Sequence, residues 1–238
     1  MRHYGIIGQP LEHSFSARYF TDKFMRENID ADFRLFPISD IALVTPLLTQ
    51  LDGFNVTLPY KQAIIPYLSG IDSVAAHIGA VNVVHAQRGY NTDWIGFTQS
   101  IQPMLTEKDT HALILGTGGV SRAVTYALKQ LGITTLFVSR QARSGSITYA
   151  DITSDTIQQY TIIVNCTPLG MYPHTQSCPA IPYQLLTSNH LLFDCVYNPE
   201  KTLFLQQGEK QGARTQNGLQ MLYRQADAAW QIWNSNNN

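Results

Sequence analysis

Residues Leu113 to Ala123 form the segment Leu-Ile-Leu-Gly-Thr-Gly-Gly-Val-Ser-Arg-Ala, which indicates the fold of the domain around it. Its apolar residues predict a buried strand, and its glycines predict a tight turn. The residues after the glycines predict a helix. Glycine lets the backbone come close to a ligand, and the first turn of a helix offers unpaired N–H groups to a pyrophosphate. A plain glycine turn is the alternative, but the position between strand and helix favours a Rossmann-type dinucleotide-binding loop. Ser121, another small residue, stands where that fingerprint has its third glycine.

The residues around this loop predict the rest of a domain. Strand-like segments alternate with helical ones, which is typical of an α/β fold with a mostly parallel sheet. The expected strands are 111–115, 134–139, 161–165, 191–196 and 213–215, and the expected helices are 120–131, 151–157 and 202–211. We therefore assign residues 106–216 to a Rossmann-type domain that binds a dinucleotide.

The end of the second strand of this domain indicates which cofactor it takes. An NAD-binding domain has an acidic residue about 20 positions after the glycine loop, where it binds the ribose 2′-hydroxyl. Here no Asp or Glu occurs between Thr110 and Ala150, and the strand ends in Ser139-Arg140, with Arg143 nearby. A guanidinium matches a 2′-phosphate in charge and in geometry. The alternative is a solvated surface arginine, but the missing carboxylate also favours NADP over NAD.

The part of the chain before residue 106 predicts a second α/β domain with a mostly parallel sheet. The expected strands are 4–7, 32–36, 53–56, 80–85 and 88–91, and the expected helices are 16–28, 41–51, 61–68 and 94–105. A last helix over 218–233 has one apolar face, formed by Leu219, Leu222, Ala226, Ala229 and Trp230. We expect a substrate-binding domain of residues 1–105 that is completed by the C-terminal helix 217–238, with a cleft between the two domains.

The overall composition excludes several classes of protein. The chain has 238 residues, of which 44% are hydrophobic and 14% charged, so it is globular. A formal net charge of -1 gives no general attraction to nucleic acid or anionic membranes. No apolar run is long enough to span a membrane, and no signal peptide is visible. Three cysteines without a close pair indicate free thiols and a cytoplasmic location, and the seven histidines show no metal-binding spacing. We expect no metal, nucleic-acid or membrane partner.

Lys61 and Asp93 are candidates for acid–base chemistry, because each follows a predicted strand. An amine beside a carboxylate can pass a proton to and from an alcohol oxygen while a hydride leaves its carbon. Ser14 and Ser16 offer two hydroxyls in one loop, which suits a carboxylate ligand. Taken singly, these residues have simpler interpretations: a solvated lysine, a helix N-cap at Asp93, and two capping serines.

The motifs considered together resemble the shikimate dehydrogenase family. They occur in order from residue 5 to about residue 233, and they are Gly8-x-Pro10-x-x-His13-Ser14-x-Ser16, Asn55-Val56-Thr57-x-Pro59-x-Lys61, Gly79-Ala80-Val81-Asn82, Gly89-Tyr90-Asn91-Thr92-Asp93-x-x-Gly96, Gly116-Thr117-Gly118-Gly119-Val120-Ser121-Arg122-Ala123, Asn165-Cys166-Thr167-Pro168-Leu169-Gly170-Met171, Asp194-x-x-Tyr197-x-Pro199-x-x-Thr202 and Gly218-Leu219-Gln220-Met221-Leu222-x-x-Gln225.

The resemblance implies a role for each matching residue. Lys61 and Asp93 resemble the catalytic pair, and Ser14 and Ser16 the hydroxyls that hold the substrate carboxylate. The residues that resemble the groups around the ring hydroxyls of the substrate are Thr57, Asn82, Asp93 and Gln225. Tyr197 matches a position close to the substrate. The positions that resemble the NADP-binding loops and the surroundings of the nicotinamide are Gly116, Gly118, Gly119, Val120, Ser139, Arg140, Thr167, Gly218 and Met221.

The resemblance implies an NADP-dependent oxidoreductase acting on a CH–OH group, which reversibly reduces 3-dehydroshikimate to shikimate in chorismate and aromatic amino acid biosynthesis. We expect a small-molecule substrate and a monomer or homodimer. Two departures stand out: Ala17 replaces the family's proline after Ser16, and Ser139-Arg140-Gln141 replaces Asn-Arg-Thr. The alternatives are an NAD-linked quinate or shikimate dehydrogenase and a catalytically inactive ligand-binding relative.

Overall fold

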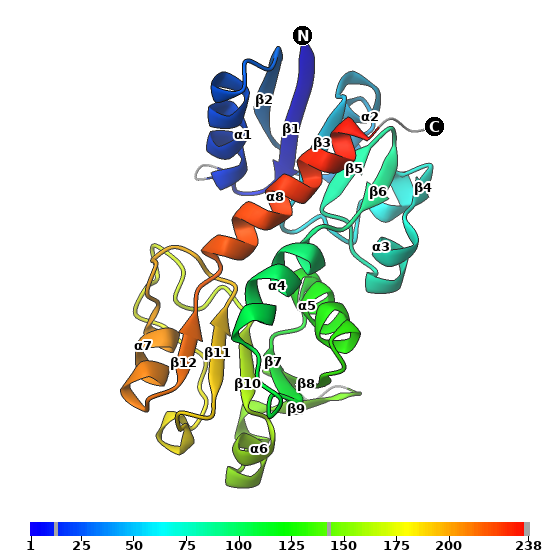
Figure 1. The fold of residues 1–238 in the computed structure, drawn as a ribbon. Helices are drawn as coiled ribbons and strands as arrows, with labels where there is room; N and C mark the ends of the chain where they lie inside the picture. The colour runs from blue at the N-terminus through cyan, green and yellow to red at the C-terminus, as the bar shows by residue number, and fades with distance from the viewer. Residues whose placement is uncertain (12–13, 142–143, 236–238) are drawn as a thin grey trace. The chain divides into compact units, whose positions relative to one another are not determined.

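The computed structural model describes residues 1–11, 14–141 and 144–235. His13 and Arg143, which the sequence analysis named, lie outside the described residues. The chain forms two compact units, and each is described by itself (Figure 1). Unit 1 comprises Met1–Thr92 together with the residues from Gln225 onward, and unit 2 comprises Asp93–Arg224.

Unit 1 is built on a six-stranded sheet in the order β2-β1-β3-β5-β6-β4. Its strands are β1 (Arg2–Gly8), β2 (Ala31–Pro37), β3 (Gly53–Val56), β4 (Gly70–Ile71), β5 (Val83–His85) and β6 (Arg88–Tyr90). Strand β1 pairs in parallel with β2 and β3, and β4 with β6, whereas β5 is antiparallel to β3 and β6. The sheet is mostly parallel, as predicted. Its antiparallel part is the β5–β6 hairpin, whose two turn residues, Ala86 and Gln87, have φ angles of 47° and 59°.

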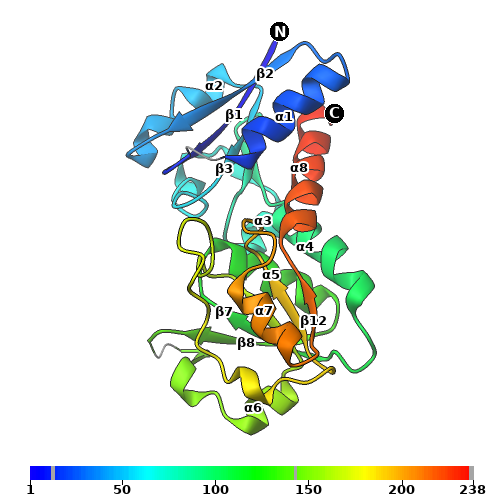
Figure 2. The same cartoon turned by 90° about the vertical axis from the view of Figure 1, so that its left-hand side faces the viewer.

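Helices cover both faces of this sheet. One face carries α1 (Phe15–Arg26) and the end of α8 (Leu219–Asn234), which lie side by side in Figure 2. Between them an aromatic cluster forms, in which Phe20 contacts Phe33 and Trp233, each with ring centroids 4.9 Å apart. The other face is covered by α2 (Leu47–Gln50), α3 (Ser73–Ile78) and short 3-10 helices, around a core that includes Ile7 and Phe54.

Trp233 fixes the packing of α8 on the sheet of unit 1. Its indole Nε1 donates a hydrogen bond to the carbonyl of Val84 at 3.1 Å, and its ring stacks on Tyr4. The ring lies directly over Gly53 in β3, where a Cβ would come within 2.5 Å of Nε1. Only a glycine leaves room for the indole at this place in the sheet.

We therefore expect Gly53→Ala to lower the free energy of unfolding by about 1–3 kcal/mol, the usual cost of overpacking a filled core. The matched control is Gly70→Ala in β4, where the nearest atom to an added Cβ is Arg88 Nη1 at 3.8 Å. Urea unfolding followed by tryptophan fluorescence measures both. Equal stability of the two variants would show that the indole does not constrain this position.

Unit 2 contains a second six-stranded sheet, in which all pairings are parallel. Its strands are β7 (His111–Leu115), β8 (Thr134–Ser139), β9 (Ser146–Thr148), β10 (Ile162–Asn165), β11 (Leu191–Asp194) and β12 (Arg214–Gln216). Their order, β12-β11-β10-β7-β8-β9, is that of the doubly wound Rossmann fold. The predicted fold class, two α/β domains of which one is of Rossmann type, is thus confirmed.

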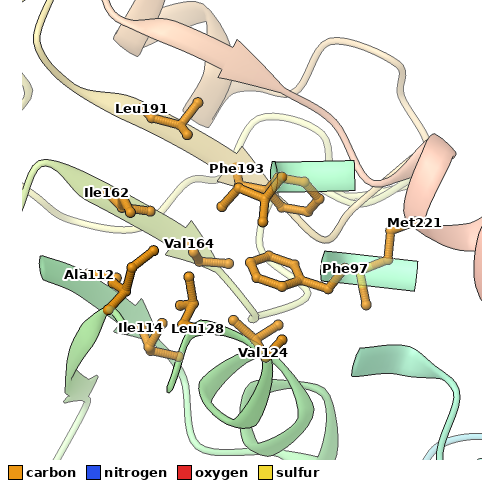
Figure 3. Packing of buried hydrophobic residues seen from close by; sticks show 13 residues of the cluster. Phe97, Ala112, Ile114, Val124, Leu128, Ile162, Val164, Leu191, Phe193 and Met221 are labelled. Atoms are coloured by element: carbon orange, nitrogen blue, oxygen red, sulfur yellow. The ribbon is translucent and has the colours of Figure 1, made fainter. Parts of the chain in front are cut away.

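The core of unit 2 lies on both faces of its sheet, as a parallel sheet requires. One face packs against α4 (Asp93–Ile101) and α5 (Gly119–Gln130), where Phe97, Val124 and Phe193 meet (Figure 3). The rings of Phe97 and Phe193 lie 4.8 Å apart, edge to face. The other face packs against α6 (Ser154–Gln159) and α7 (Leu203–Lys210).

The packing of α4 bears on the predicted domains. We expected the first domain to contain residues 1–105 together with all of the C-terminal helix. In the structure Phe97 and Ile101 of α4, and Met221 in the first turn of α8, belong to the core of unit 2. An apolar face alone does not specify which sheet it will cover.

Several predicted elements differ in detail. The predicted helix 41–51 is wrong as one helix: it divides into a 3-10 helix, Ile41–Val44, and α2, because Pro46 between them has no N–H to donate. The predicted helix 61–68 is wrong, since only Ile65–Tyr67 form a 3-10 helix. The pattern also missed β4, β9 and α3, which begins after Asp72, whose carboxylate accepts hydrogen bonds from the first helical N–H groups.

Candidate active site

The glycine loop of unit 2 has the geometry of a phosphate cradle. Gly116 follows β7 with φ of 103°, a left-handed conformation that favours glycine, and a Cβ there would lie 3.0 Å from the methyl group of Thr167. Gly118 is the N-cap of α5 and is exposed, with no atom within 4 Å of an added Cβ. The N–H groups of the first turn of α5 have no intrahelical acceptor, so the helix can receive a pyrophosphate here.

Ser121 explains how this loop works without its third glycine. The side chain is fully buried, and its hydroxyl donates a hydrogen bond to the carbonyl of Gly118 at 2.6 Å. The hydroxyl therefore has its partner inside the helix turn. The substitution does not obstruct the exposed side of the loop at Gly118.

Ser139 and Arg140 end strand β8 as predicted, beside β7 and its loop. Ser139 is buried and donates a hydrogen bond to the carbonyl of Gln141, whereas Arg140 is exposed. Burial raises the pKa of Tyr149, and the guanidinium of Arg140 opposes that rise, so this charge lies near the Tyr149 hydroxyl. Arg140 thus stands at the strand end where a dinucleotide fold distinguishes a 2′-phosphate from a 2′-hydroxyl.

Thr167 is held next to the glycine loop by a buried amide. Asn165, at the end of β10, accepts hydrogen bonds from the backbone N–H and the hydroxyl of Thr167 at 3.0 and 2.6 Å. The Nδ2 group of Asn165 donates to the carboxylate of Asp194 at 2.9 Å. The cofactor residue predicted at Thr167 therefore depends on two buried polar residues for its position.

Asp194 is fully buried at the end of β11 and accepts three hydrogen bonds. Besides Asn165, its donors are the N–H of Val196 at 2.9 Å and the hydroxyl of Thr202 at 2.5 Å. Burial raises the pKa of Asp194 to about 6, although these hydrogen bonds act in the opposite direction. A carboxylate in this position connects β10, β11 and the start of α7.

The raised pKa makes the stability of unit 2 depend on pH. The folded protein binds this proton more tightly than the unfolded chain, so the contribution of Asp194 to stability falls as the pH rises from about 4 to about 6. At about 1.4 kcal/mol per pKa unit, the loss amounts to roughly 3 kcal/mol. Asp194→Asn keeps an acceptor for Asn165 and Val196 and a donor for the Thr202 oxygen, and it removes the titration.

We expect the free energy of unfolding of Asp194→Asn, relative to the unchanged protein, to increase between pH 4 and pH 6 and to stay level above that. Urea unfolding of both proteins at a series of pH values measures the difference in their free energies of unfolding. The contributions of the other carboxylates are the same in both proteins, so they cancel in this difference. Parallel curves across this interval would contradict a raised pKa at Asp194.

In unit 1 the amide of Asn82 is the centre of a buried polar cluster. Its Oδ1 accepts a hydrogen bond from the N–H of Thr92 at 2.7 Å, and its Nδ2 donates to Thr92 Oγ1 at 3.0 Å and to Gln225 Oε1 at 3.4 Å. Asn82 and Gln225 are 143 positions apart in the sequence. The structure thus brings together two of the residues predicted to surround the ring hydroxyls of a substrate.

Asn55 and Asn91 support this cluster from the neighbouring backbone. The Nδ2 group of Asn55 donates to the carbonyl of Asn82 at 3.3 Å, and that of Asn91 donates to the carbonyl of Ala80 at 2.9 Å. The Oδ1 atom of Asn55 is buried and has no partner among the described residues. A buried acceptor of this kind is costly unless a ligand or water donates to it.

Thr57 and Lys61 lie in the loop after β3. The N–H of Thr57 donates a hydrogen bond to the carbonyl of Ile7 at 3.0 Å. The carbonyl of Lys61 accepts one from the N–H of Val81 at 2.7 Å. These backbone bonds place the loop beside the ends of β1 and β3 and next to Asn82. Both side chains are partly exposed, so they can reach a ligand at this edge of the sheet.

Ser14 and Ser16 lie at the start of α1. Ser14 is the N-cap, but its side chain makes no capping hydrogen bond, which argues against the simpler interpretation of this serine. Ser16 is 8% exposed in the first turn. Hydroxyls at the beginning of a helix are well placed for an anionic group, since the helix dipole adds a favourable field there.

The predicted catalytic pair lies on either side of the division between the units. Lys61 belongs to unit 1, and Asp93, the first residue of α4, belongs to unit 2 and is 5% exposed. Asp93 directly follows Thr92, which is bound to Asn82.

Three other predicted site residues lie in unit 2. Tyr197 is partly exposed after β11, and burial raises the pKa of its hydroxyl. Gly218 passes so close to β11 that a Cβ would lie 2.5 Å from the carbonyl oxygen of Cys195. Met221 is 6% exposed and packs in the core against Phe97 and Phe193, so most of its surface has a structural role (Figure 3).

Among the residues that the structure describes, no group of His, Cys, Asp or Glu side chains could hold a metal ion. Within the same residues, no helix is both long and apolar enough to span a membrane.

The comparisons with known proteins agree with this geometry. Residues 6–84 match the model of the shikimate dehydrogenase substrate binding domain. Over 96% of its length the chain is 35% identical to shikimate dehydrogenase (NADP(+)) from Methanosphaera stadtmanae, covering 90% of that protein. The chain belongs to the shikimate dehydrogenase family. The matched segment contains Ser14, Ser16, Thr57, Lys61 and Asn82, which are the predicted substrate-binding and catalytic residues of the N-terminal part.

Solved structures of the shikimate dehydrogenase family share the whole fold. Shikimate 5-dehydrogenase from Thermus thermophilus, in complex with NADP(H) and shikimate, superposes with a TM-score of 0.87 at 25% identity, covering 99% of this chain and 94% of that one. Quinate dehydrogenase from Corynebacterium glutamicum, in complex with NAD, superposes with a TM-score of 0.85 at 26% identity. The match covers 99% of this chain and 94% of that one. The structures similar to this chain thus include complexes with either cofactor.

The sequence motifs contain several residues for which we predicted no role. The structure now shows what these residues contact. Asn165, Asp194 and Thr202 form the buried support of Thr167, and Thr92 binds Asn82. Polar residues directly after apolar strands were the available signal. The pattern could not tell a supporting residue from one that contacts a ligand, because both occur at strand ends.

Proposed function

We propose that this protein is an NADP-dependent shikimate dehydrogenase, which reversibly reduces 3-dehydroshikimate to shikimate in chorismate and aromatic amino acid biosynthesis. One observation carries the proposal: Asn82 and Gln225, assigned to the ring hydroxyls from the sequence, meet in one buried cluster with Thr92. Amide and hydroxyl groups gathered at one sheet edge, beside the loop of Lys61, suit a small polyhydroxylated substrate.

The glycine loop and its surroundings fit NADP. The exposed Gly118, the open first turn of α5 and the exposed guanidinium of Arg140 can receive a pyrophosphate and a 2′-phosphate. Gly119, Val120, Ser139 and Thr167 complete the proposed binding residues of this loop region, with Gly218 and Met221 toward the nicotinamide. When bound, NADPH supplies the hydride that reduces the ketone.

The residues of the chain supply binding and the proton. Ser14 and Ser16 hold the substrate carboxylate, and Thr57, Asn82, Tyr197 and Gln225 orient the ring. The ammonium group of Lys61 donates a proton to the ketone oxygen, and in the reverse direction the amine accepts it from the alcohol. The carboxylate of Asp93, the proposed partner of Lys61, accepts a hydrogen bond from a ring hydroxyl.

A steady-state assay tests the function. Shikimate with NADP⁺ is compared with quinate and NAD⁺, in all four combinations, on the purified protein. We expect shikimate with NADP⁺ to give the highest kcat/KM. Preference for quinate with NAD⁺ would assign the protein to the alternative activity, and the absence of turnover in every combination would favour a binding relative.

Lys61→Ala should lower kcat by roughly 10²–10⁴, the usual contribution of a general acid–base group, and change KM for shikimate much less. The backbone bond from Val81 to the carbonyl of residue 61 is kept in the variant. Lys108→Ala, at an exposed lysine of unit 2, is the matched control and should keep its activity. Turnover within a few-fold of normal in Lys61→Ala would remove this residue from the mechanism.

Arg140 should determine the preference for NADP⁺. A charge-assisted hydrogen bond contributes about 1.5–3 kcal/mol, which corresponds to a preference of about 10- to 100-fold in kcat/KM. Arg140→Ala should lose most of this preference, because its kcat/KM falls for NADP⁺ and stays nearly unchanged for NAD⁺. Arg140→Lys keeps the charge without the planar fork, so its preference should lie between those of Arg140→Ala and the unchanged protein. Equal losses with NADP⁺ and NAD⁺ would show that Arg140 acts on the loop and not on the 2′-phosphate.

We further propose that the enzyme works in the cytoplasm as a monomer or homodimer, without a nucleic-acid partner. The cysteines of the described chain are free thiols, which fits a reducing compartment. A formal net charge of -1 gives no general attraction for nucleic acid. Sedimentation of the purified protein over a range of concentrations distinguishes the two assembly states.

A further inference from the structure

Two cysteines of unit 2 lie next to each other on neighbouring strands. Cys166 directly follows β10 and Cys195 directly follows β11, and their Sγ atoms are 3.8 Å apart. The strands pair in parallel up to Asn165 and Asp194, and the N–H of Cys195 donates to the carbonyl of Asn165 at 2.9 Å. The sheet therefore holds the two cysteines in register.

This geometry is close to that of a disulfide. Neighbouring strands lie about 4.8 Å apart, within the range of about 4.4–6.8 Å between the Cα atoms of bonded cysteines. Both thiols also lie on the same face of the sheet, the one that packs against α4 and α5. The sulfur atoms would have to approach by a rotation of the side chains, without a change in the strand pairing.

The third cysteine is separate from this pair. Cys178 packs on the opposite face of the sheet, with Tyr183 and Ile181. It is partly buried, as are Cys166 and Cys195. Cys178 therefore provides an internal control for any reagent that reaches the pair.

The pair is stable as two thiols at rest. The hydrogen bond with Cys166 raises the pKa of the Cys195 thiol, and burial acts in the same direction. Thiolates are the reactive species, so a raised pKa keeps this thiol mostly unreactive and makes its reaction with an oxidant slow. The pair is thus suited to an occasional modification and not to turnover.

We propose that Cys166 and Cys195 form a site of reversible oxidation, at which a hydroperoxide converts the two thiols into a disulfide. One thiolate attacks the peroxide oxygen, which breaks the O–O bond and leaves a sulfenic acid and hydroxide. The second thiol attacks the sulfenic sulfur, and water leaves. Two thiols and one hydrogen peroxide thus give one disulfide and two waters, and a dithiol reductant reverses the change by exchange.

The bond would act on the proposed cofactor site, and this part of the inference rests on the proposed function. The carbonyl oxygen of Cys166 lies 3.4 Å from a Cβ built on Gly116, and that of Cys195 lies 2.5 Å from one built on Gly218. Thr167 is the next residue after Cys166. The disulfide would tie the segments of these residues to each other, and we expect kcat/KM for NADP⁺ to fall about tenfold.

The test measures the covalent change first, without reference to activity. The reduced protein is treated with hydrogen peroxide, alkylated with N-ethylmaleimide and weighed by intact mass spectrometry. We expect a loss of about 2 Da and one alkylated thiol where the reduced protein has three. Peptide mapping should find Cys166 joined to Cys195. Cys178→Ser should still lose two thiols, whereas Cys166→Ser and Cys195→Ser should form no internal disulfide.

Specific results would overturn the proposal. They are oxygen addition to single cysteines without cross-linking, a bond that includes Cys178, or a covalent dimer on a non-reducing gel. These readouts need no variant to fold and no substrate to turn over. If the disulfide forms and kcat/KM for NADP⁺ is unchanged, the coupling to the cofactor site is wrong. If the reduced protein has no dehydrogenase activity, the proposed function fails while the mass result stands.

Discussion

Both units depend on the way in which a sheet brings the ends of its strands to one edge. In unit 2 the parallel ladder continues past the strands: Gly116 donates its N–H to Val138, Cys166 to Leu115 and Cys195 to Asn165. In unit 1 the antiparallel β5 starts where β3 ends, so Val56 bonds to Asn82, and Asn82 bonds to Tyr90. Residues from distant parts of the chain are thereby placed side by side, at the position where α/β folds bind their ligands.

Buried polar side chains hold these edges in place, and they differ between the units. Unit 1 uses amides, centred on Asn82, which remain neutral and can give and accept hydrogen bonds at once. Unit 2 uses a carboxylate, Asp194, which accepts three hydrogen bonds but is shielded from water. Burying a charge costs more than burying an amide, and the raised pKa of Asp194 is the measure of that cost.

Much of the candidate site could be proposed from the sequence, because its residues lie in short motifs. Strand β8 and its end at Ser139-Arg140 followed from a local apolar run and from the absence of carboxylates. The helix expected at 61–68 failed because its apolar spacing had no cap and contained Pro66, whose ring prevents a regular helix. The proximity of Cys166 and Cys195 was not predicted either, since 29 positions separate them and only strand pairing joins them.

Local patterns in the sequence predict the Rossmann loop and the order of strands and helices around it. They also indicate the candidate acid–base residues and the proposed 2′-phosphate site at Arg140. These follow from local patterns, since periodicity, glycines and charge act within a few residues. Only the tertiary structure decided that α4 packs with unit 2, that Gln225 meets Asn82, and that the indole of Trp233 covers Gly53. Such contacts depend on which surfaces fit together after the sheets have formed, because packing energy belongs to pairs of distant surfaces and not to any one segment.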